Sequence, residues 1–250
     1  MNIKVATKYQ INEYLKSIKI FYLVVILVLI FFGVITAVNS SSNFYSTGGI
    51  EGSTIIFLFI LGLNSFKETF LMMLQNGTTR RSMFIGRLIT ILATSVFMAV
   101  VDRFVVNITL LLNDVSERFR VGGMYEEFFV QRAESLHIVV RNLEAILITI
   151  GMYAAVMVAG YLITSAYYRM NKILKIAVSI GVPTSVLILL PVLDAVVFDG
   201  RIAVAVSKFL RFVFGGQAGN PYNLLLSCII FIVVGIGLTW LLIRKSVEKS

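Results

Sequence analysis

The sequence predicts an all-α polytopic membrane protein with six transmembrane helices, an N-terminal interfacial helix, and amphipathic or re-entrant helices on the extracellular side. Composition is the first reason. Apolar residues make up 58% of the 250 residues and charged residues 14%, against roughly 45–50% and about 25% in soluble domains. The second reason is six apolar stretches near the ~20 residues that a helix needs to cross a bilayer. Together they exclude a soluble enzyme, a fibrous chain and a disordered chain.

The expected spans share long apolar runs with few charges; they are residues 20–38, 50–69, 83–101, 143–168, 173–198 and 224–243. The first is longer than the roughly 7–15 apolar residues of a signal peptide and lacks a clear cleavage site, so it is kept as a span. The fifth contains Pro183, Pro191 and Asp194, which we interpret as kinks or ends. We expect one membrane domain over residues 1–250.

Basic residues mark one side of this arrangement. The N-terminal arm, the second-to-third connection, the fourth-to-fifth turn and the tail hold 14 basic and 3 acidic residues, whereas the opposite side holds 8 and 10. The positive-inside rule therefore predicts cytoplasmic termini. This asymmetry also accounts for the net charge of +9, so no nucleic-acid partner is expected. The expected membrane-interface anchors are Lys16, Lys19, Arg87, Arg169, Lys172, Arg244 and Lys245.

The N-terminal arm has the pattern of an interfacial helix. Ile11, Leu15, Ile18 and Tyr22 recur at steps of four, three and four, which is the spacing of one helix face. A helix with an apolar face and flanking lysines is typical of the membrane surface. The alternative is that the first span simply extends into water.

Two outer segments are longer than simple turns. In residues 102–141, which are charged and mixed in sign, Phe129, Ala133, Leu136 and Val140 have the spacing of one amphipathic helix after a Gly-Gly break. Residues 200–219 carry an apolar face flanked by basic residues and end in glycines. This second pattern predicts a re-entrant or surface helix.

Motifs of soluble catalysis are missing from the sequence. It contains no Walker A pattern, no G-x-S-x-G and no H-E-x-x-H, so the chain has no P-loop of its own for ATP. With one cysteine and one histidine, it cannot build a disulfide framework or a zinc or Fe–S cluster. We expect no catalytic, cofactor-binding or metal-binding residues.

Glu126 and Glu127, followed by Arg132, His137 and Asn142, resemble the motif of paired-glutamate intramembrane proteases of the prenyl-protein-processing type. That motif sets three residues between the glutamates and the arginine, and three between the histidine and the asparagine; here both gaps are four. One extra residue turns a helical side chain by about 100°, so the set does not converge. We interpret the glutamates as solvated loop residues and the histidine as a surface or packing residue.

Ionisable residues inside the spans are few. Lys67 and Glu68 lie at one end of the second span, and Arg87 is expected to snorkel out of the third. The sequence shows no buried Asp, Glu or His series of the kind that proton relays use. A proton- or sodium-driven carrier is therefore disfavoured.

Residues 67–87, KETFLMMLQNGTTRRSMFIGR, form the most informative stretch. A helix is expected to leave the membrane, to break at the turn signal of Asn76 and Gly77, and to restart after Thr79 as its N-cap. Arg80 and Arg81 then begin the helix that continues into the third span. This pattern predicts a compact basic elbow on the cytoplasmic side.

The elbow resembles the asparagine–glycine–x–x–arginine elbow of permease subunits in Gram-positive ABC-2-type transporters. Those subunits have six spans, cytoplasmic termini, an N-terminal interfacial helix and a re-entrant element before the last span, so the resemblance covers the topology of nearly the whole chain. It implies a coupling helix that docks into a separate ATPase subunit, where ATP and magnesium would bind. The implied contacts are Gln75, Asn76, Gly77, Thr78, Thr79, Arg80 and Arg81, with Lys67 and Glu68 behind them.

The resemblance also implies the function of such a subunit. It would be the permease of an ATP-driven exporter in the bacterial cytoplasmic membrane, paired with a second permease chain that is identical or a sibling. Related permeases export amphipathic peptides, bacteriocins, drugs or lipid-like molecules, and the modulin-toxin exporters of staphylococci are one group. The alternatives are a non-transporting structural, sensory or immunity protein, a carrier that works alone, and the intramembrane protease.

Overall fold

The computed structural model describes residues 3–38, 44–113, 119–215 and 220–244. In these residues six helical segments are long and apolar enough to cross a bilayer, as the sequence predicts. They are α1 (Ile3–Val38), α2 (Gly49–Asn64) with α3 (Lys67–Gln75), α4 (Arg80–Asn113), α7 (Ile138–Arg169), α8 (Lys172–Thr184) continuing through the π-helix η1 (Ser185–Leu189) into α9 (Leu190–Val197), and α11 (Pro221–Ile243).

The N-terminal arm and the first span form one helix of 36 residues, about 54 Å long at 1.5 Å per residue. No break separates the arm from the first span, because no proline or glycine interrupts residues 3–32; whether the arm lies on the membrane surface or extends into water stays a prediction. Ala6, Gln10, Tyr14 and Ile18 form its buried face. Of the four residues of the predicted apolar face, only Ile18 belongs to this buried face.

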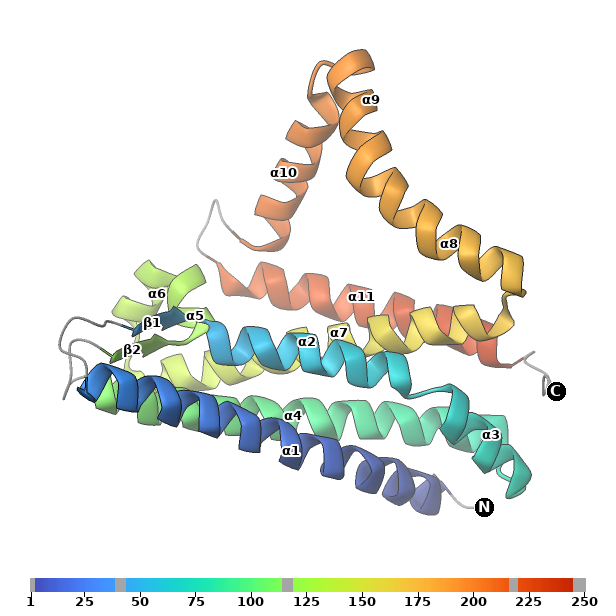
Figure 1. The fold of residues 1–250 in the computed structure, drawn as a ribbon, viewed down its shortest axis with the longest axis horizontal. Coiled ribbons are helices and arrows are strands. Elements are labelled where there is room, and N and C mark those ends of the chain that lie inside the picture. The colour runs from blue at the N-terminus through green and yellow to red at the C-terminus, as the bar shows by residue number, and fades with distance from the viewer. Residues whose placement is uncertain (1–2, 39–43, 114–118, 216–219, 245–250) are drawn as a thin grey trace.

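The helices α1, α2, α4, α7 and α11 form a bundle (Figure 1). At its centre Tyr14 and Leu58 pack with Met98, Tyr153 and other buried residues of α1, α2, α4 and α7. The backbones of α2 and α7 come closest at Gly62 and Gly160, where an added Cβ on Gly160 would lie 2.6 Å from the carbonyl oxygen of Phe59. Small residues at a helix crossing allow this close approach within a membrane.

A two-stranded parallel sheet, which the sequence did not reveal, lies at the end of the bundle opposite the N-terminus (Figure 1). We call this the outer end, after the side of the membrane that the charge distribution predicts for it. Strand β1 (Phe44–Thr47) pairs with β2 (Phe119–Gly122), and Phe44 lies opposite Phe119. The two strands are separated by α2, α3 and α4. Strands of four residues are too short to show a reliable alternation of apolar and polar residues.

The amphipathic helix expected around residues 129–140 is also wrong. Two short helices, α5 (Met124–Phe128) and α6 (Val130–Ser135), stand in its place, and α7 begins at Ile138. Phe129 and Ala133 are buried as the pattern requires, but Leu136 has an extended backbone and Val140 is 44% exposed. The helix is interrupted at Leu136, because a new helix, α7, starts shortly after it. The side chain of His137 caps α7 by accepting from the Val139 amide.

The helix of the third span runs to Asn113, well past the expected end at residue 101. Asp102 and Arg103 therefore belong to the helix, where they are 0% and 3% exposed, and not to the outer segment. The helix continues past the end of the apolar run, because these charged side chains find partners inside the bundle.

The fifth span stands apart from the bundle, and α10 (Arg201–Val213) leads back from it toward α11 (Figure 1). The π-helix follows Pro183 and precedes Pro191, which fits the sequence interpretation of these prolines as kinks. Asp194 accepts hydrogen bonds from the amides of Ile202 and Ala203, both at 2.8 Å. The carboxylate thereby caps α10 and fixes the turn between α9 and α10; residues 216–219 of the expected re-entrant segment lie outside the described residues.

Candidate functional site

The elbow between α3 and α4 has the turn that its sequence predicts. After α3 ends at Gln75, Gly77 adopts a φ of +70°, in the left-handed region that favours glycine. The Thr78 amide donates to the carbonyl of Met73 at 2.9 Å, and the Asn76 side chain donates to the carbonyl of Met72 at 2.8 Å. The end of α3 is therefore closed by its own turn residues.

The start of α4 is fixed in two ways. The Thr79 hydroxyl accepts from the Ser82 amide at 3.2 Å, which confirms Thr79 as the N-cap. The Arg80 guanidinium donates to the carbonyl oxygen of Arg244 at 3.0 Å. Because a helix C-terminus carries partial negative charge, this contact attaches the elbow to the end of α11.

The predicted contact residues divide by exposure. The exposed ones are Gln75, Asn76, Gly77, Thr79 and Arg81. Thr78 is 3% exposed and Arg80 is half-buried, so these two belong to the base of the elbow. The side chains of Lys67 and Glu68 lie outside the described residues, although their backbone begins α3.

One end of the molecule holds the elbow, the start of α1 and the end of α11, and the sheet with α5 and α6 lies at the other end (Figure 1). This is the arrangement that an even number of crossings requires. Of the other expected interface anchors, Lys16, Lys19, Arg169, Lys172 and Arg244 are exposed, and Lys245 lies outside the described residues. Their side of the membrane stays a prediction from the distribution of charge.

Arg87 does not snorkel, contrary to the sequence prediction. It is 2% exposed, and its guanidinium donates to the Tyr14 hydroxyl at 2.6 Å. The same group lies 5.2 Å from the ring centroid of Tyr14 and 5.9 Å from that of Tyr161. Arg87 therefore points into the bundle, where aromatic faces compensate part of its charge.

Further polar contacts surround Arg87 below the elbow. Thr69 of α3 donates to the Glu13 carboxylate of α1 at 3.0 Å, and Gln10 donates to the carbonyl of Met83 at 3.4 Å. Both contacts join α1 to residues on either side of the turn. The result is a polar connection between the elbow and the first span.

Buried carboxylates, which the sequence analysis did not find in the spans, lie in the outer half of the bundle. Asp102 accepts hydrogen bonds from the hydroxyls of Tyr22, at 2.8 Å, and Tyr153. Glu51 is 2% exposed and accepts from the Met124 amide. Asp102 lies seven residues after Ser95, and the structure buries both on the same face of α4; the sequence alone did not show which face that is.

The residues of the protease-like pattern make structural contacts at the outer end. Arg103 donates to Glu126 at 3.0 Å and to the side-chain oxygen of Asn142 at 2.7 Å, and Arg141 lies 3.7 Å from Glu126. Glu126 is therefore an ion-pair partner, not the solvated residue that we expected. His137 is exposed and caps α7, in agreement with its interpretation as a surface residue.

The ion pairs decide the protonation of Glu126. Burial alone would raise the pKa of its carboxyl, but the hydrogen bonds and charge of Arg103, aided by the charge of Arg141, outweigh burial and lower the pKa below its ordinary range. Glu144 has a similar set of partners, because Arg132 donates to it at 2.8 Å and Tyr222 at 2.7 Å. These contacts hold α5 and α6 against α4, α7 and α11.

Fold and site together define a helical membrane protein with a structured basic elbow between two of its candidate spans. The chain matches no protein-family model, no curated protein and no solved structure. Within the described ranges, no three His, Cys, Asp or Glu side chains are grouped to hold a metal ion. Its function must therefore be inferred from its own residues.

Proposed function

We propose that this chain is the permease subunit of an ATP-driven exporter in a bacterial cytoplasmic membrane, and that its elbow binds a separate ATPase subunit. The observation that carries the proposal is the exposure of Gln75, Asn76, Gly77 and Arg81 above a base fixed by buried Thr78. A docking element needs accessible contacts on a rigid support. The resemblance of this elbow to those of ABC-2-type permeases supports the assignment.

In this mechanism two permease chains, identical or siblings, form a path for amphipathic or hydrophobic cargo. Dimerisation of two ATPase subunits pushes the elbows together. The movement passes to α11 through Arg80 and Arg244, and to α1 through Arg87 and Tyr14. The spans then switch the cargo path from open to the inside to open to the outside. ATP binding drives this switch only to the extent that it favours the second arrangement over the first.

Co-purification with an ABC-type ATPase subunit, sought first in the reading frames that neighbour this gene, tests the proposal. We expect Arg80→Glu/Arg81→Glu to abolish the complex, because reversed charges oppose the basic contact. Since Arg80 also contacts α11, the single variant Arg81→Glu separates docking from folding. The matched control is Arg169→Glu/Lys172→Glu, which reverses two exposed basic residues outside the elbow. A complex that survives every elbow variant contradicts the proposed contact.

A second candidate function, an ion-coupled carrier, is favoured by buried Asp102 with its two tyrosine partners. Ionisable groups within spans often mark ion pathways. The chain alone in vesicles would then take up a fluorescent amphipathic peptide under an imposed proton gradient, and Asp102→Asn would abolish uptake. Uptake only with the ATPase and ATP would instead favour the exporter.

A further inference from the structure

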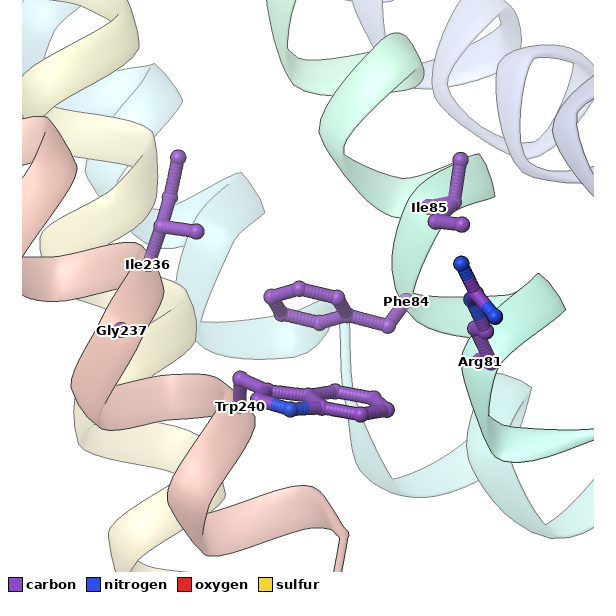
Figure 2. Close-up of a pocket in the computed structure, with 6 residues that line it drawn as sticks. All are labelled: Arg81, Phe84, Ile85, Ile236, Gly237 and Trp240. Carbon is purple, nitrogen blue, oxygen red and sulfur yellow. The ribbon is translucent and has the colours of Figure 1, made fainter.

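A groove of about 510 Å³ opens between α4 and α11 beside the elbow. Its lining residues are Arg81, Phe84 and Ile85 of α4 and Ile236, Gly237 and Trp240 of α11 (Figure 2). The volume lies within the roughly 300–1,000 Å³ of ligand-binding clefts. The groove is apolar apart from the one guanidinium.

The floor and one wall of the groove are defined by aromatic rings and a glycine. The rings of Phe84 and Trp240 face each other, with centroids 5.1 Å apart (Figure 2). A Cβ added to Gly237 would meet no atom within 4 Å, so the α11 wall is bare backbone at that point. The missing side chain leaves room beside Trp240 for an apolar group to lie against the backbone of α11.

The positive charge of Arg81 at the rim of the groove favours an anionic occupant. Arg81 is exposed, and no described acidic side chain forms an ion pair with it. The Arg80 guanidinium donates to the carbonyl of Arg244, the residue that follows α11. A second copy of the chain has the same basic residues at this end, including exposed Lys16 and Arg169, and so offers little negative charge to Arg81.

The position of the groove agrees with a lipid occupant. Trp240 lies near the end of a helix long enough to span the bilayer, and tryptophan is enriched where acyl chains meet headgroups. A span placed with Trp240 at that boundary would put the apolar floor at the depth of acyl chains and Arg81 at the depth of phosphates. We propose that the groove binds one acyl chain of an anionic phospholipid, with Arg81 contacting the phosphate headgroup.

The tryptophan itself reports on this site, because the chain contains only one. The full-length protein is reconstituted in phosphatidylcholine vesicles with a rising fraction of phosphatidylglycerol whose acyl chains carry bromine, a contact quencher of indole fluorescence. Brominated phosphatidylcholine serves as the neutral lipid. We expect half-maximal quenching at an about fivefold lower fraction of the anionic lipid, the gain from one arginine near an anionic headgroup.

Two variants separate headgroup and groove. Arg81→Gln keeps an exposed polar side chain and should make the anionic and neutral lipids quench alike. Gly237→Leu should fill the groove and lower maximal quenching by both lipids. The control Lys172→Gln changes an exposed basic residue outside the groove and should keep the fivefold preference.

Three outcomes would overturn the proposal. Equal quenching of the native protein by both lipids would indicate only the ordinary lipid shell. If neither lipid quenches the fluorescence at first, and quenching appears only when the protein is diluted in the bilayer, a second copy of the chain covers the groove. A preference retained by Arg81→Gln would exclude this arginine as the headgroup contact. Arg81 is also a proposed ATPase contact, and the two roles would compete for its guanidinium; because the assay contains no ATPase, a failure of the lipid preference leaves the exporter proposal standing.

Discussion

Arg87 and Tyr14 join the third candidate span to the first inside the bundle, through a hydrogen bond of 2.6 Å between guanidinium and hydroxyl. Both side chains are at least 97% buried. No described carboxylate forms an ion pair with Arg87, so the tyrosine hydroxyl and the aromatic faces do most to replace water around this charge. An arginine near a span end is thus part of the interior of the protein.

The hydroxyl of Tyr14 should therefore contribute to stability. We expect Tyr14→Phe to lower the free energy of unfolding by about 1.5–3 kcal/mol, the range for a hydrogen bond to a charged group. Thermal or denaturant unfolding in detergent micelles measures the change. Tyr9→Phe on the same helix is the matched control, because Tyr9 is 42% exposed. Equal effects of the two substitutions would contradict a special role for Tyr14.

The crossing of α2 and α7 depends on glycine at position 160. Gly160→Ala places a methyl group 2.6 Å from a backbone carbonyl and 2.8 Å from a backbone amide of α2. The helices must separate, and we expect a loss of about 1–3 kcal/mol in unfolding free energy. Gly33→Ala is the control, since its Cβ would meet nothing within 4 Å and the change should be neutral or stabilising. If both variants unfold alike, the backbones are not packed this closely.

The Glu126 ion pairs should make the outer end sensitive to acid. Because the pKa of Glu126 is lower in the folded state than in the unfolded state, its contribution is complete above the unfolded pKa of about 4.3. It is lost as the pH falls through the lowered folded value. Hydrogen exchange of α5, corrected for intrinsic rates, should therefore show constant protection down to a pH of about 4 and opening below it.

Glu126→Gln is the control for this acid sensitivity. It should open α5 at all pH values and remove the part of the pH dependence that Glu126 contributes. An unchanged acid profile in this variant would assign the transition to other carboxyl groups, such as Glu144.

The cap on α10 should be local in its effect. Asp194→Ala removes the acceptor for the amides of Ile202 and Ala203 and should cost about 0.5–2 kcal/mol. We expect faster hydrogen exchange in the first turn of α10, with exchange in α7 unchanged. Asp194→Asn keeps an oxygen acceptor and should retain part of the protection. Protection that is equal in all three proteins would contradict the cap.

The two ends of the molecule should differ in their access to a thiol reagent that does not cross membranes. Cys228 is the only cysteine and is removed first as Cys228→Ala. In that background we expect Glu127→Cys to react in intact cells and Gln75→Cys only after permeabilisation, since both positions are exposed at opposite ends. The reverse result would place the elbow outside and contradict the proposed ATPase contact.

The parts of the fold that follow from local sequence could be predicted. The apolar runs identified six candidate membrane-spanning segments, and the turn at Gly77 with the cap at Thr79 follows from residues that are adjacent in the chain. Parallel pairing of Phe44 with Phe119 could not be predicted, because it depends on contacts across three intervening helices. A strand of four residues is also too short to show a recognisable alternation of apolar and polar residues.

The polar interior was the main error, and its cause is general. Hydropathy treats Asp102 and Arg103 as the end of a span, because each charge costs free energy in lipid. In the bundle, Tyr22 and Tyr153 donate hydrogen bonds to the aspartate, and the arginine donates to Glu126 and Asn142. These partners come from distant parts of the chain, so no local window contains the compensation. Arg87 was misplaced for the same reason.

The length of α4 has a mechanical consequence. This one helix of 34 residues is roughly 51 Å long. It begins at Arg80 in the elbow and contains Arg103, which forms an ion pair with Glu126 of α5 at the outer end. A displacement of Arg80 along the axis of this continuous helix would therefore also move Arg103 and the ion pair that it forms with Glu126.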